Sequence, residues 1–334
     1  MRRLENPWRG KGLTLDVPMP ASDAGAVLAL LQNCPAHTET PLVPVAGLAG
    51  VGCAWVKDER TRMGLGSFKA LGAAHVIAHA AQSGPLDGIT YVTASAGNHG
   101  LSVAAGARVF GARAVIYLSE TVPAVFAERL RAKGAEVVRA GHDYEASMQA
   151  AAQAADENGW ILLSDSSWEG YTELPHRLME GYLAMAEEAA NQLPEPPTHI
   201  LLQAGVGGLA GAVAAHARAR WGDGPQIIVV EPEAAPALYE SIRLGEAVET
   251  TGPVSVMGRL DCKAPSLIAL QGLSRDADAF VLITEAEAEE VLPALAAVDL
   301  ATTASGGAGL AALIAGAVSD PNARVLTFLT EAPE

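Results

Sequence analysis

The segment Arg62-Met63-Gly64-Leu65-Gly66-Ser67-Phe68-Lys69-Ala70-Leu71-Gly72 places a single lysine between a glycine-rich turn and an apolar helix. Phe68 and Leu71 flank Lys69, and alanines follow, so we expect the lysine side chain to point into a crowded, dry space. Desolvation lowers the pKa of a lysine and leaves a neutral amine that can attack a carbonyl carbon. On its own, the segment leaves two interpretations open: a reactive amine, or an ordinary lysine at a helix start.

The composition limits the classes of protein to which the chain can belong. With 334 residues, it is long enough for one large or two smaller domains. Half of the residues are hydrophobic but only 5% are aromatic, which favours helices packed on sheets over a β-sandwich. The formal net charge of -16 argues against nucleic acid or an anionic membrane as a partner, because both bind basic surfaces.

The cysteines and the hydrophobic pattern favour a cytoplasmic protein without a metal. Cys34, Cys53 and Cys262 have no CxxC spacing, so we expect neither a zinc site nor a disulfide framework, and the scattered histidines suggest no other metal. No apolar run approaches the length of a membrane span, and the first residues lack the hydrophobic segment of a signal peptide. We therefore expect a cytoplasmic location and no membrane partner.

Strands and helices alternate regularly along most of the chain. The first series has strands at 90–93, 114–118, 136–138 and 161–163, with helices at 98–110, 123–133 and 143–157. After a helix at 176–192, a second series has strands at 200–202, 227–230, 280–283 and 325–328. This spacing predicts parallel pairing through right-handed crossovers, so we expect an α/β fold of two lobes, each a mostly parallel sheet covered by helices. Ligands of such sheets bind outside the carboxyl ends of the strands.

Two turns that join a strand to a helix carry unusual residues. Ala204-Gly205-Val206-Gly207-Gly208-Leu209 follows one strand, and a glycine turn that opens a helix exposes backbone N–H groups to a phosphate. Ser95-Ala96-Gly97-Asn98-His99 follows another, and its side chains and amides can hold a carboxylate or a phenolic oxygen. Taken alone, the glycine turn is as typical of a plain tight turn as of a phosphate site. The 95–99 turn alone is as typical of a Ser or Asn helix N-cap as of an anion-binding site.

Together, the embedded lysine, the glycine turn and the anion-binding turn predict one cofactor site. A lysine amine beside a phosphate site is what pyridoxal 5'-phosphate requires. In their order, Ser67-Phe68-Lys69, the 95–99 turn and the 205–208 loop resemble the fold-type II pyridoxal phosphate enzymes of the serine/threonine dehydratase and tryptophan synthase β group. The resemblance implies a large cofactor-binding lobe formed by 1–82 and 174–334, and a small inserted lobe formed by 83–173.

Within that group, the chain resembles the diaminopropionate ammonia-lyases over about residues 25–318. The matching segments are Trp55–Glu59, Gly64-Leu65, Asp165–Thr172, Pro197–His199, Gln203–Gly207 and Met257–Cys262. By this resemblance, Lys69 would form the Schiff base, Asn98 would bind the phenolic oxygen, and Gly205, Val206, Gly207 and Gly208 would hold the phosphate. Ser305 would be the neutral partner of the pyridine nitrogen, with Thr303 as the alternative.

The resemblance also assigns acid–base and substrate-binding residues. Asp165 would assist elimination as a second catalytic residue, and the turn of Ser95, Ala96, Gly97 and His99 would bind the substrate. Ala96 replaces a family aspartate tied to use of the D-isomer, so we expect a preference for L-substrates. Arg259 and Lys263 replace family glycines. They are either surface residues or a binding site for a second anionic group on the substrate, as in 3-hydroxyaspartate.

The activity that the resemblance implies is β-elimination on a small amino acid. We expect a 2,3-diaminopropionate ammonia-lyase reaction that gives pyruvate and ammonia. The alternatives are a dehydratase of a β-hydroxy amino acid (serine, threonine or 3-hydroxyaspartate), a β-replacement synthase, and a non-catalytic pyridoxal phosphate-binding paralogue. The expected partners are the small amino-acid substrate and a second copy of the chain in a homodimer.

Overall fold

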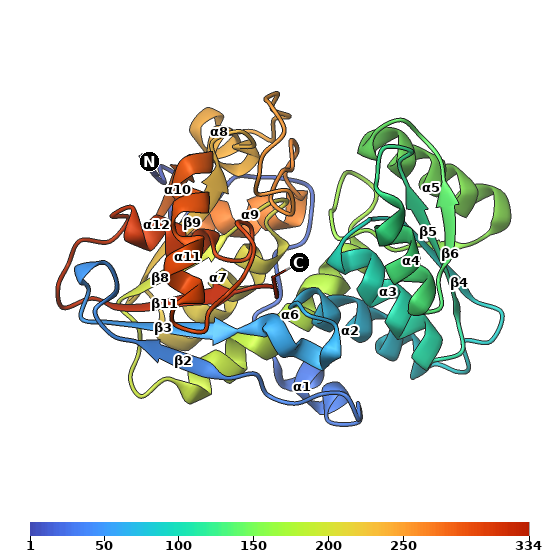
Figure 1. Ribbon diagram of the computed structural model, residues 1–334, viewed down its shortest axis with the longest axis horizontal. Coiled ribbons are helices and arrows are strands. Elements are labelled where there is room, and N and C mark those ends of the chain that lie inside the picture. Colours follow the sequence, from blue (N-terminus) through green and yellow to red (C-terminus); the bar gives the residue numbers. More distant parts are fainter. Residues whose placement is uncertain (334) are drawn as a thin grey trace.

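In the computed structural model, which describes residues 1–333, two β-sheets lie side by side and helices cover each of them (Figure 1). The strands are β1 (Arg2–Glu5), β2 (Leu42–Val45), β3 (Cys53–Asp58), β4 (Thr90–Ala94), β5 (Arg113–Leu118), β6 (Glu136–Arg139), β7 (Ile161–Leu162), β8 (His199–Gln203), β9 (Gln226–Pro232), β10 (Ala279–Ile283) and β11 (Arg324–Leu329). The larger sheet has the order β1-β10-β9-β8-β11-β3-β2, and the smaller has the order β6-β5-β4-β7.

The helices occupy the intervals between the strands. They are α1 (Gly25–Leu31), α2 (Lys69–Ala81), α3 (Asn98–Val109), α4 (Ala124–Ala132), α5 (Tyr144–Asn158), α6 (Glu173–Gln192), α7 (Gly208–Trp221), α8 (Ala237–Leu244), α9 (Leu267–Asp276), α10 (Glu285–Glu290), α11 (Leu292–Ala296) and α12 (Ala308–Ile314), with 3-10 turns η1 (Leu48–Gly50) and η2 (Glu59–Gly64). Among these residues, no helix has both the length and the hydrophobicity needed to cross a membrane.

The smaller sheet is parallel throughout and is buried on both faces. Successive side chains of a strand point to opposite faces. Val92 and Val115 therefore pack with Ala151 of α5 on one face. On the other face, Tyr91 and Ile116 join the cluster that includes residues of α3 and α4. The alternation of strands and helices predicted for this part of the chain is confirmed.

In the larger sheet, five parallel strands are flanked by an antiparallel strand at each edge. The central strands are apolar on both faces. Ile227 and Val229 of β9 face α6 and α7, whereas Ile228 and Val230 face α10, α11 and α12. The mostly parallel two-sheet fold is therefore confirmed. Every strand of the smaller sheet lies between residues 83 and 173, but the expected lobe boundaries themselves stay a prediction.

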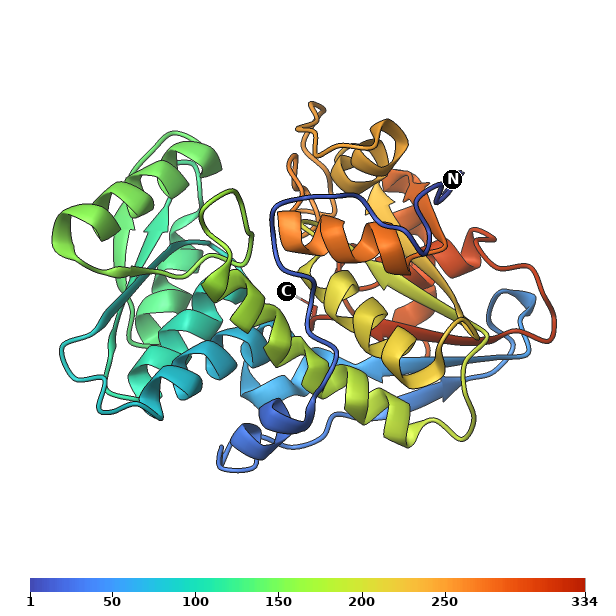
Figure 2. The ribbon, with the colours of Figure 1, turned by 180° about the vertical axis from the view of Figure 1, so that it is seen from behind.

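Two helices link the lobes and pack closely against each other. Figure 2 shows that α6 runs from the smaller lobe along the larger one. A Cβ atom placed on Gly72 of α2 would lie 2.8 Å from Leu178 and 2.9 Å from Tyr182 of α6. A Cβ atom on Gly181 would lie 2.5 Å from the carbonyl oxygen of Leu71. Because neither helix can carry a side chain at these points, the start of α2 is held firmly against α6.

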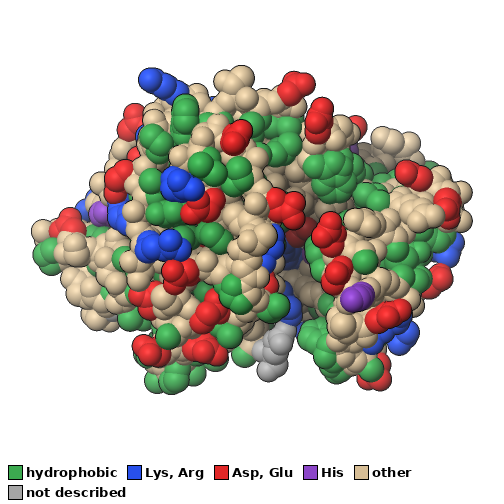
Figure 3. All heavy atoms as spheres, turned by 90° about the horizontal axis from the view of Figure 1, so that it is seen from above, with side chains coloured by type: hydrophobic (Ala, Val, Ile, Leu, Met, Phe, Trp, Pro, Cys, Tyr) green, Lys and Arg blue, Asp and Glu red, His purple; other side chains and the backbone are tan. Residues whose placement is uncertain are grey.

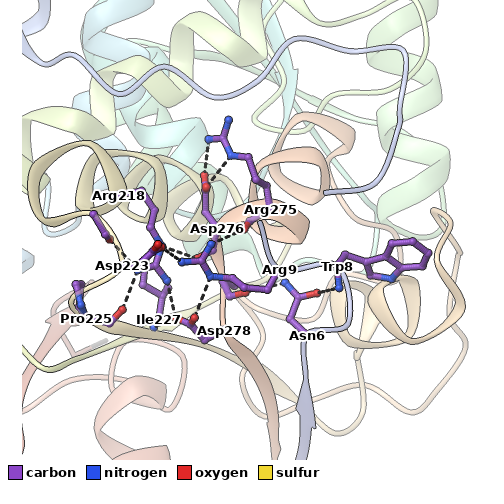
Figure 4. A network of polar contacts seen from close by, with 12 residues as sticks. Asn6, Trp8, Arg9, Arg218, Asp223, Pro225, Ile227, Arg275, Asp276 and Asp278 are labelled. Atoms are coloured by element: carbon purple, nitrogen blue, oxygen red, sulfur yellow. Dashed lines mark hydrogen bonds and ion pairs between the residues drawn. The ribbon is translucent and has the colours of Figure 1, made fainter. Parts of the chain in front are cut away.

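The N-terminal segment, which the sequence did not predict to be a strand, is fixed to the larger lobe. β1 pairs antiparallel with β10, and the turn after it forms the polar network in Figure 4. Arg9 donates from Nε to Asp278 at 2.9 Å and also pairs with Asp223. Asp278 in turn accepts from the backbone N–H of Ile227 at 2.7 Å. These contacts stabilise an edge strand whose own side chains are mostly exposed.

Candidate active site

Lys69 and Asp165 meet where the two lobes face each other. Lys69 is the first residue of α2, and Asp165 lies in the loop between β7 and α6. The Nζ of Lys69 donates a hydrogen bond to Oδ2 of Asp165, with side chains 20% and 18% exposed. Figure 3 shows a groove between the lobes, with Lys and Arg side chains along its floor and carboxylates on its rim. The predicted catalytic pair is thus brought together from positions 96 residues apart.

The state of Lys69 differs from the sequence-based expectation. Burial lowers the pKa of Lys69 and is the largest single effect, but the charge and hydrogen bond of Asp165, together with smaller contributions from Tyr182 and Cys262, outweigh it, so the net pKa lies above its ordinary value. Burial acts in the opposite direction on Asp165 and raises its pKa, but contact with the Lys69 ammonium brings that pKa well below its usual range. The expectation of a neutral amine is therefore wrong for this structure, because desolvation is outweighed by an opposite charge in contact.

An aromatic wall closes one side of the Lys69 amine. Nζ lies 5.5 Å from the centroid of the Phe68 ring, and that ring packs against Tyr182 of α6 at 4.9 Å between centroids. Tyr182 is 2% exposed, and within the described residues its hydroxyl has no hydrogen-bond partner. The same holds for the hydroxyl of Ser67, which is 1% exposed. Tyr182 was missed by the sequence reasoning because it lies on the buried face of an amphipathic helix without a motif.

The predicted phosphate loop lies directly beside this pair. It follows β8, its Gly207 has a φ of 99°, and α7 begins at Gly208. A Cβ atom on Gly208 would lie 3.5 Å from the Tyr182 ring and 4.0 Å from the carbonyl oxygen of Asp165. A Cβ atom on Gly205 would lie 2.9 Å from Sγ of Cys262. The loop therefore needs glycine at Gly205 for close packing and at Gly207 for its backbone angle, and it presents the positive end of α7 to the site.

The 95–99 turn forms the smaller lobe's side of the site. Oγ of Ser95 accepts the N–H of Gly97 at 3.3 Å, and α3 begins at Asn98. Nε2 of His99 lies 2.8 Å from the carbonyl oxygen of Leu163, and burial lowers the pKa of His99. His99 is thus a buried, neutral ring held by the backbone, with Nε2 donating. The roles of Ser95, Ala96, Gly97 and His99 in binding a substrate stay predictions.

A carboxylate that the sequence reasoning missed, Glu331, lies at the other side of the turn. It follows β11, is 6% exposed, and accepts hydrogen bonds from the side chains of Asn98 and Thr303. Oγ1 of Thr302 donates to its backbone carbonyl oxygen at 2.6 Å. Ser305, proposed as a pyridine partner, accepts the backbone N–H of Arg259 at 3.0 Å. No motif marks Glu331, and only the fold places it against the turn.

The two basic residues of the 257–263 segment have different surroundings. Nζ of Lys263 donates to Asp261 at 2.5 Å and to the carbonyl oxygens of Ala234 and Pro253 at 2.9 and 3.0 Å. Three acceptors use the three N–H bonds of an ammonium, so Lys263 fixes its own loop and does not serve as a substrate ligand. The suggestion that it pairs a substrate anion is therefore wrong. Arg259 instead reaches toward the 95–99 turn.

Comparison with known proteins identifies the chemistry of this arrangement. The model of the family described as "Pyridoxal-phosphate dependent enzyme" matches residues 34–331. This chain belongs to that family. It is 35% identical over 274 residues to the diaminopropionate ammonia-lyase of Salmonella typhimurium, covering 73% of this chain and 68% of the relative. It is 34% identical over 276 residues to the corresponding protein of Escherichia coli, covering 75% and 69%.

Solved structures agree with the sequence comparison. The crystal structure of E. coli diaminopropionate ammonia-lyase in complex with an aminoacrylate-PLP azomethine reaction intermediate superposes with a TM-score of 0.88. It is 29% identical to this chain, and the match covers 99% of this chain and 93% of that one. A threonine deaminase isoform of Solanum lycopersicum has a TM-score of 0.82 at 20% identity, which shows the shared fold.

The residues present fit the cofactor of this pyridoxal-phosphate dependent enzyme. A partly buried amine for its aldehyde, a glycine loop at a helix N-terminus for its phosphate and an amide donor from the smaller lobe converge on one site. The residues 1–333 contain no cluster of His, Cys, Asp and Glu that could hold a metal ion.

Proposed function

We propose that this enzyme catalyses β-elimination on a small L-amino acid of the 2,3-diaminopropionate type, releasing ammonia and a 2-oxo acid. The contact between Lys69 and Asp165 carries this proposal, because elimination needs a base for the α-proton and an acid for the departing β-group. The similarity to diaminopropionate ammonia-lyases supports the choice of substrate class. The expected homodimer and cytoplasmic location stay predictions.

Each part of the site has a task toward the cofactor. Lys69 would hold the aldehyde carbon, Gly205, Val206, Gly207 and Gly208 the phosphate, Asn98 the phenolic oxygen, and Ser305 the pyridine nitrogen. Bound pyridoxal phosphate supplies an electron sink that makes the Cα–H bond of the amino acid acidic. Nδ2 of Asn98 carries two N–H groups and uses one of them to donate to Glu331, so the other can donate to the phenolic oxygen.

The proton transfers follow from the charges in the site. Nζ of Lys69 would take the α-proton of the substrate. The pKa of Asp165 is low because the Lys69 ammonium touches it, whereas burial alone raises it. When Lys69 is neutral, the carboxyl group can therefore carry a proton on Oδ2 and pass it to the leaving group. His99, held neutral by burial, adds no competing positive charge.

The 95–99 turn would orient the substrate. Its backbone N–H groups stand at the N-terminus of α3 and can donate hydrogen bonds to the α-carboxylate, which would fix the Cα–H bond toward Lys69. Ala96 contributes no acid or base at this wall, so a D-isomer would present its α-proton to a face without a base. A crystal structure of the E. coli relative contains D-serine. For this chain we propose a preference for L-substrates.

The test is a 2-oxo acid and ammonia assay on the purified, pyridoxal phosphate-loaded protein. We expect L-2,3-diaminopropionate to give pyruvate with two ammonia per pyruvate, and much slower turnover of the D-isomer. One ammonia per 2-oxo acid from serine, threonine or 3-hydroxyaspartate, in excess of the diaminopropionate rate, would instead indicate a dehydratase. Product only with an added nucleophile would indicate a β-replacement synthase. Visible absorbance without turnover would reject catalysis, and equal rates for both enantiomers would reject the L-preference.

A further inference from the structure

Arg259 has its backbone fixed against the cofactor loop. It lies in the segment between α8 and α9, and its N–H donates to Oγ of Ser305 at 3.0 Å. Its carbonyl oxygen would lie 3.1 Å from a Cβ atom placed on Gly205. The segment therefore packs on the proposed phosphate loop, and its position depends on backbone contacts that a change of the Arg259 side chain leaves in place.

The side chain of Arg259 extends from the larger lobe to the substrate turn of the smaller lobe. Its Nε, Cζ and Cδ atoms lie 3.2, 3.3 and 3.4 Å from a Cβ atom placed on Gly97. The side chain is 32% exposed, and Nε lies 3.8 Å from Oε2 of Glu331, the carboxylate that also takes the Asn98 amide. The side chain is thus placed beside the turn proposed to bind the α-carboxylate, and it is partly exposed to solvent.

The position of the Arg259 guanidinium suits a second carboxylate of the substrate, which the α-carboxylate site cannot also bind. The N–H groups of the turn are proposed to bind one anion, and the planar guanidinium next to them can pair with a second. A carboxylate on the β-carbon of an amino acid lies only a few bonds from the α-carboxylate, so the two groups can occupy the two neighbouring sites. Glu331 balances the charge of Arg259 in this structure, and a substrate carboxylate would compete with it for the same guanidinium.

We propose that Arg259 selects substrates that carry a second carboxylate on the β-carbon beside the leaving group. The inference rests on the proposed β-elimination and adds to it a preference for the dicarboxylic relatives of each substrate, such as 3-hydroxyaspartate or 2,3-diaminosuccinate. Removal of the α-proton and protonation of the departing β-hydroxyl or β-amino group release one water or one ammonia in net terms, and hydrolysis of the resulting enamine gives oxaloacetate and ammonia. A hydroxyl leaving group yields one ammonia in total, and an amino leaving group yields two. No oxidant or reductant is needed.

The test uses pairs of substrates that differ only by the carboxylate. We compare kcat/KM for 2,3-diaminosuccinate with 2,3-diaminopropionate, and for 3-hydroxyaspartate with serine, using all stereoisomers. The unmodified enzyme should prefer the dicarboxylic member of each pair by about tenfold or more, as expected for a charge-assisted pair that is partly exposed. Arg259→Gln should abolish the preference and Arg259→Lys should retain part of it. Arg113→Gln, which removes an exposed arginine paired with Glu136, should leave it unchanged.

A binding measurement separates this inference from the proposed function. L-aspartate and L-alanine lack a good leaving group, so the visible absorbance of the bound cofactor can be titrated with each without turnover. Tighter binding of aspartate that disappears in Arg259→Gln supports the inference even where no substrate is eliminated. Equal weakening of aspartate and alanine in Arg259→Gln would overturn it, because the arginine would then serve the α-carboxylate. Equal affinities in the unmodified enzyme would overturn it as well.

Discussion

Asp165→Asn should lower the pKa of Lys69 and speed the capture of the cofactor. Asp165 supplies the largest contribution that raises this pKa against burial. Two unit charges about 3 Å apart attract by about 5 kcal/mol at an effective dielectric constant of about 20. Since one pKa unit is about 1.4 kcal/mol, and the pair is about one-fifth exposed and screened accordingly, a drop of about 2 to 3 units remains. Burial and the N-terminal position in α2 both favour the neutral amine that is left.

The assay mixes cofactor-free protein with pyridoxal phosphate and follows the visible absorbance from pH 6.5 to 10. Only the neutral amine reacts with the aldehyde, so the unmodified protein should speed up about tenfold per pH unit across the range. Asp165→Asn should react about 100-fold faster than the unmodified protein at each pH of this range. It should also lose elimination activity. Asp156→Asn, the same change at an exposed site of α5, is the control. Identical pH profiles for the three proteins would refute the assignment of Asp165 as the group that keeps Lys69 charged.

Two further predictions concern the surroundings of the site. Glu188→Gln should lower the free energy of unfolding by about 3 to 5 kcal/mol in a urea titration, because it leaves Lys57 and Arg62, both 0% exposed, with too little negative charge. Burial lowers the pKa of Lys57 in the folded protein, so at pH values up to the ordinary pKa of 10.5 the unfolded chain binds more protons than the folded one. The destabilisation caused by Glu188→Gln should therefore become smaller as the pH rises toward 10. A destabilisation that grew with pH would contradict this explanation. Gly205→Ala should weaken pyridoxal phosphate binding by at least about tenfold, since the new methyl group meets Cys262 and backbone atoms within 3.1 Å. Gly258→Ala adds the same group in open space, and equal affinities for the two variants would contradict the steric argument.

The parts of the fold and site that could be predicted are those encoded locally. Strand–helix alternation and the two glycine turns fix the sheets and the loops at their carboxyl ends, and the structure confirms both. β1 could not be predicted because an exposed edge strand pairs through its backbone and carries charged side chains such as Arg2 and Arg3. The charge state of Lys69 and the place of Glu331 were also out of reach, since each depends on a contact between residues far apart in the sequence.

The charged residues around Lys69 fall into two groups with different physical roles. Two residues of η2, Glu59 and Arg62, form a network with Lys57 and Glu188 in which every side chain is at most 2% exposed. Desolvation of these ions is complete on folding, and breaking any one pair leaves a buried charge, so the network holds the segment that leads to Lys69 rigidly. The pair of Lys69 with Asp165 is about one-fifth exposed, and water or a ligand can reach it. The rigid buried network keeps the reactive amine of Lys69 in position, and the partly exposed ion pair lets its partner change. That partner would be first Asp165, then the cofactor, and finally the α-proton of a substrate.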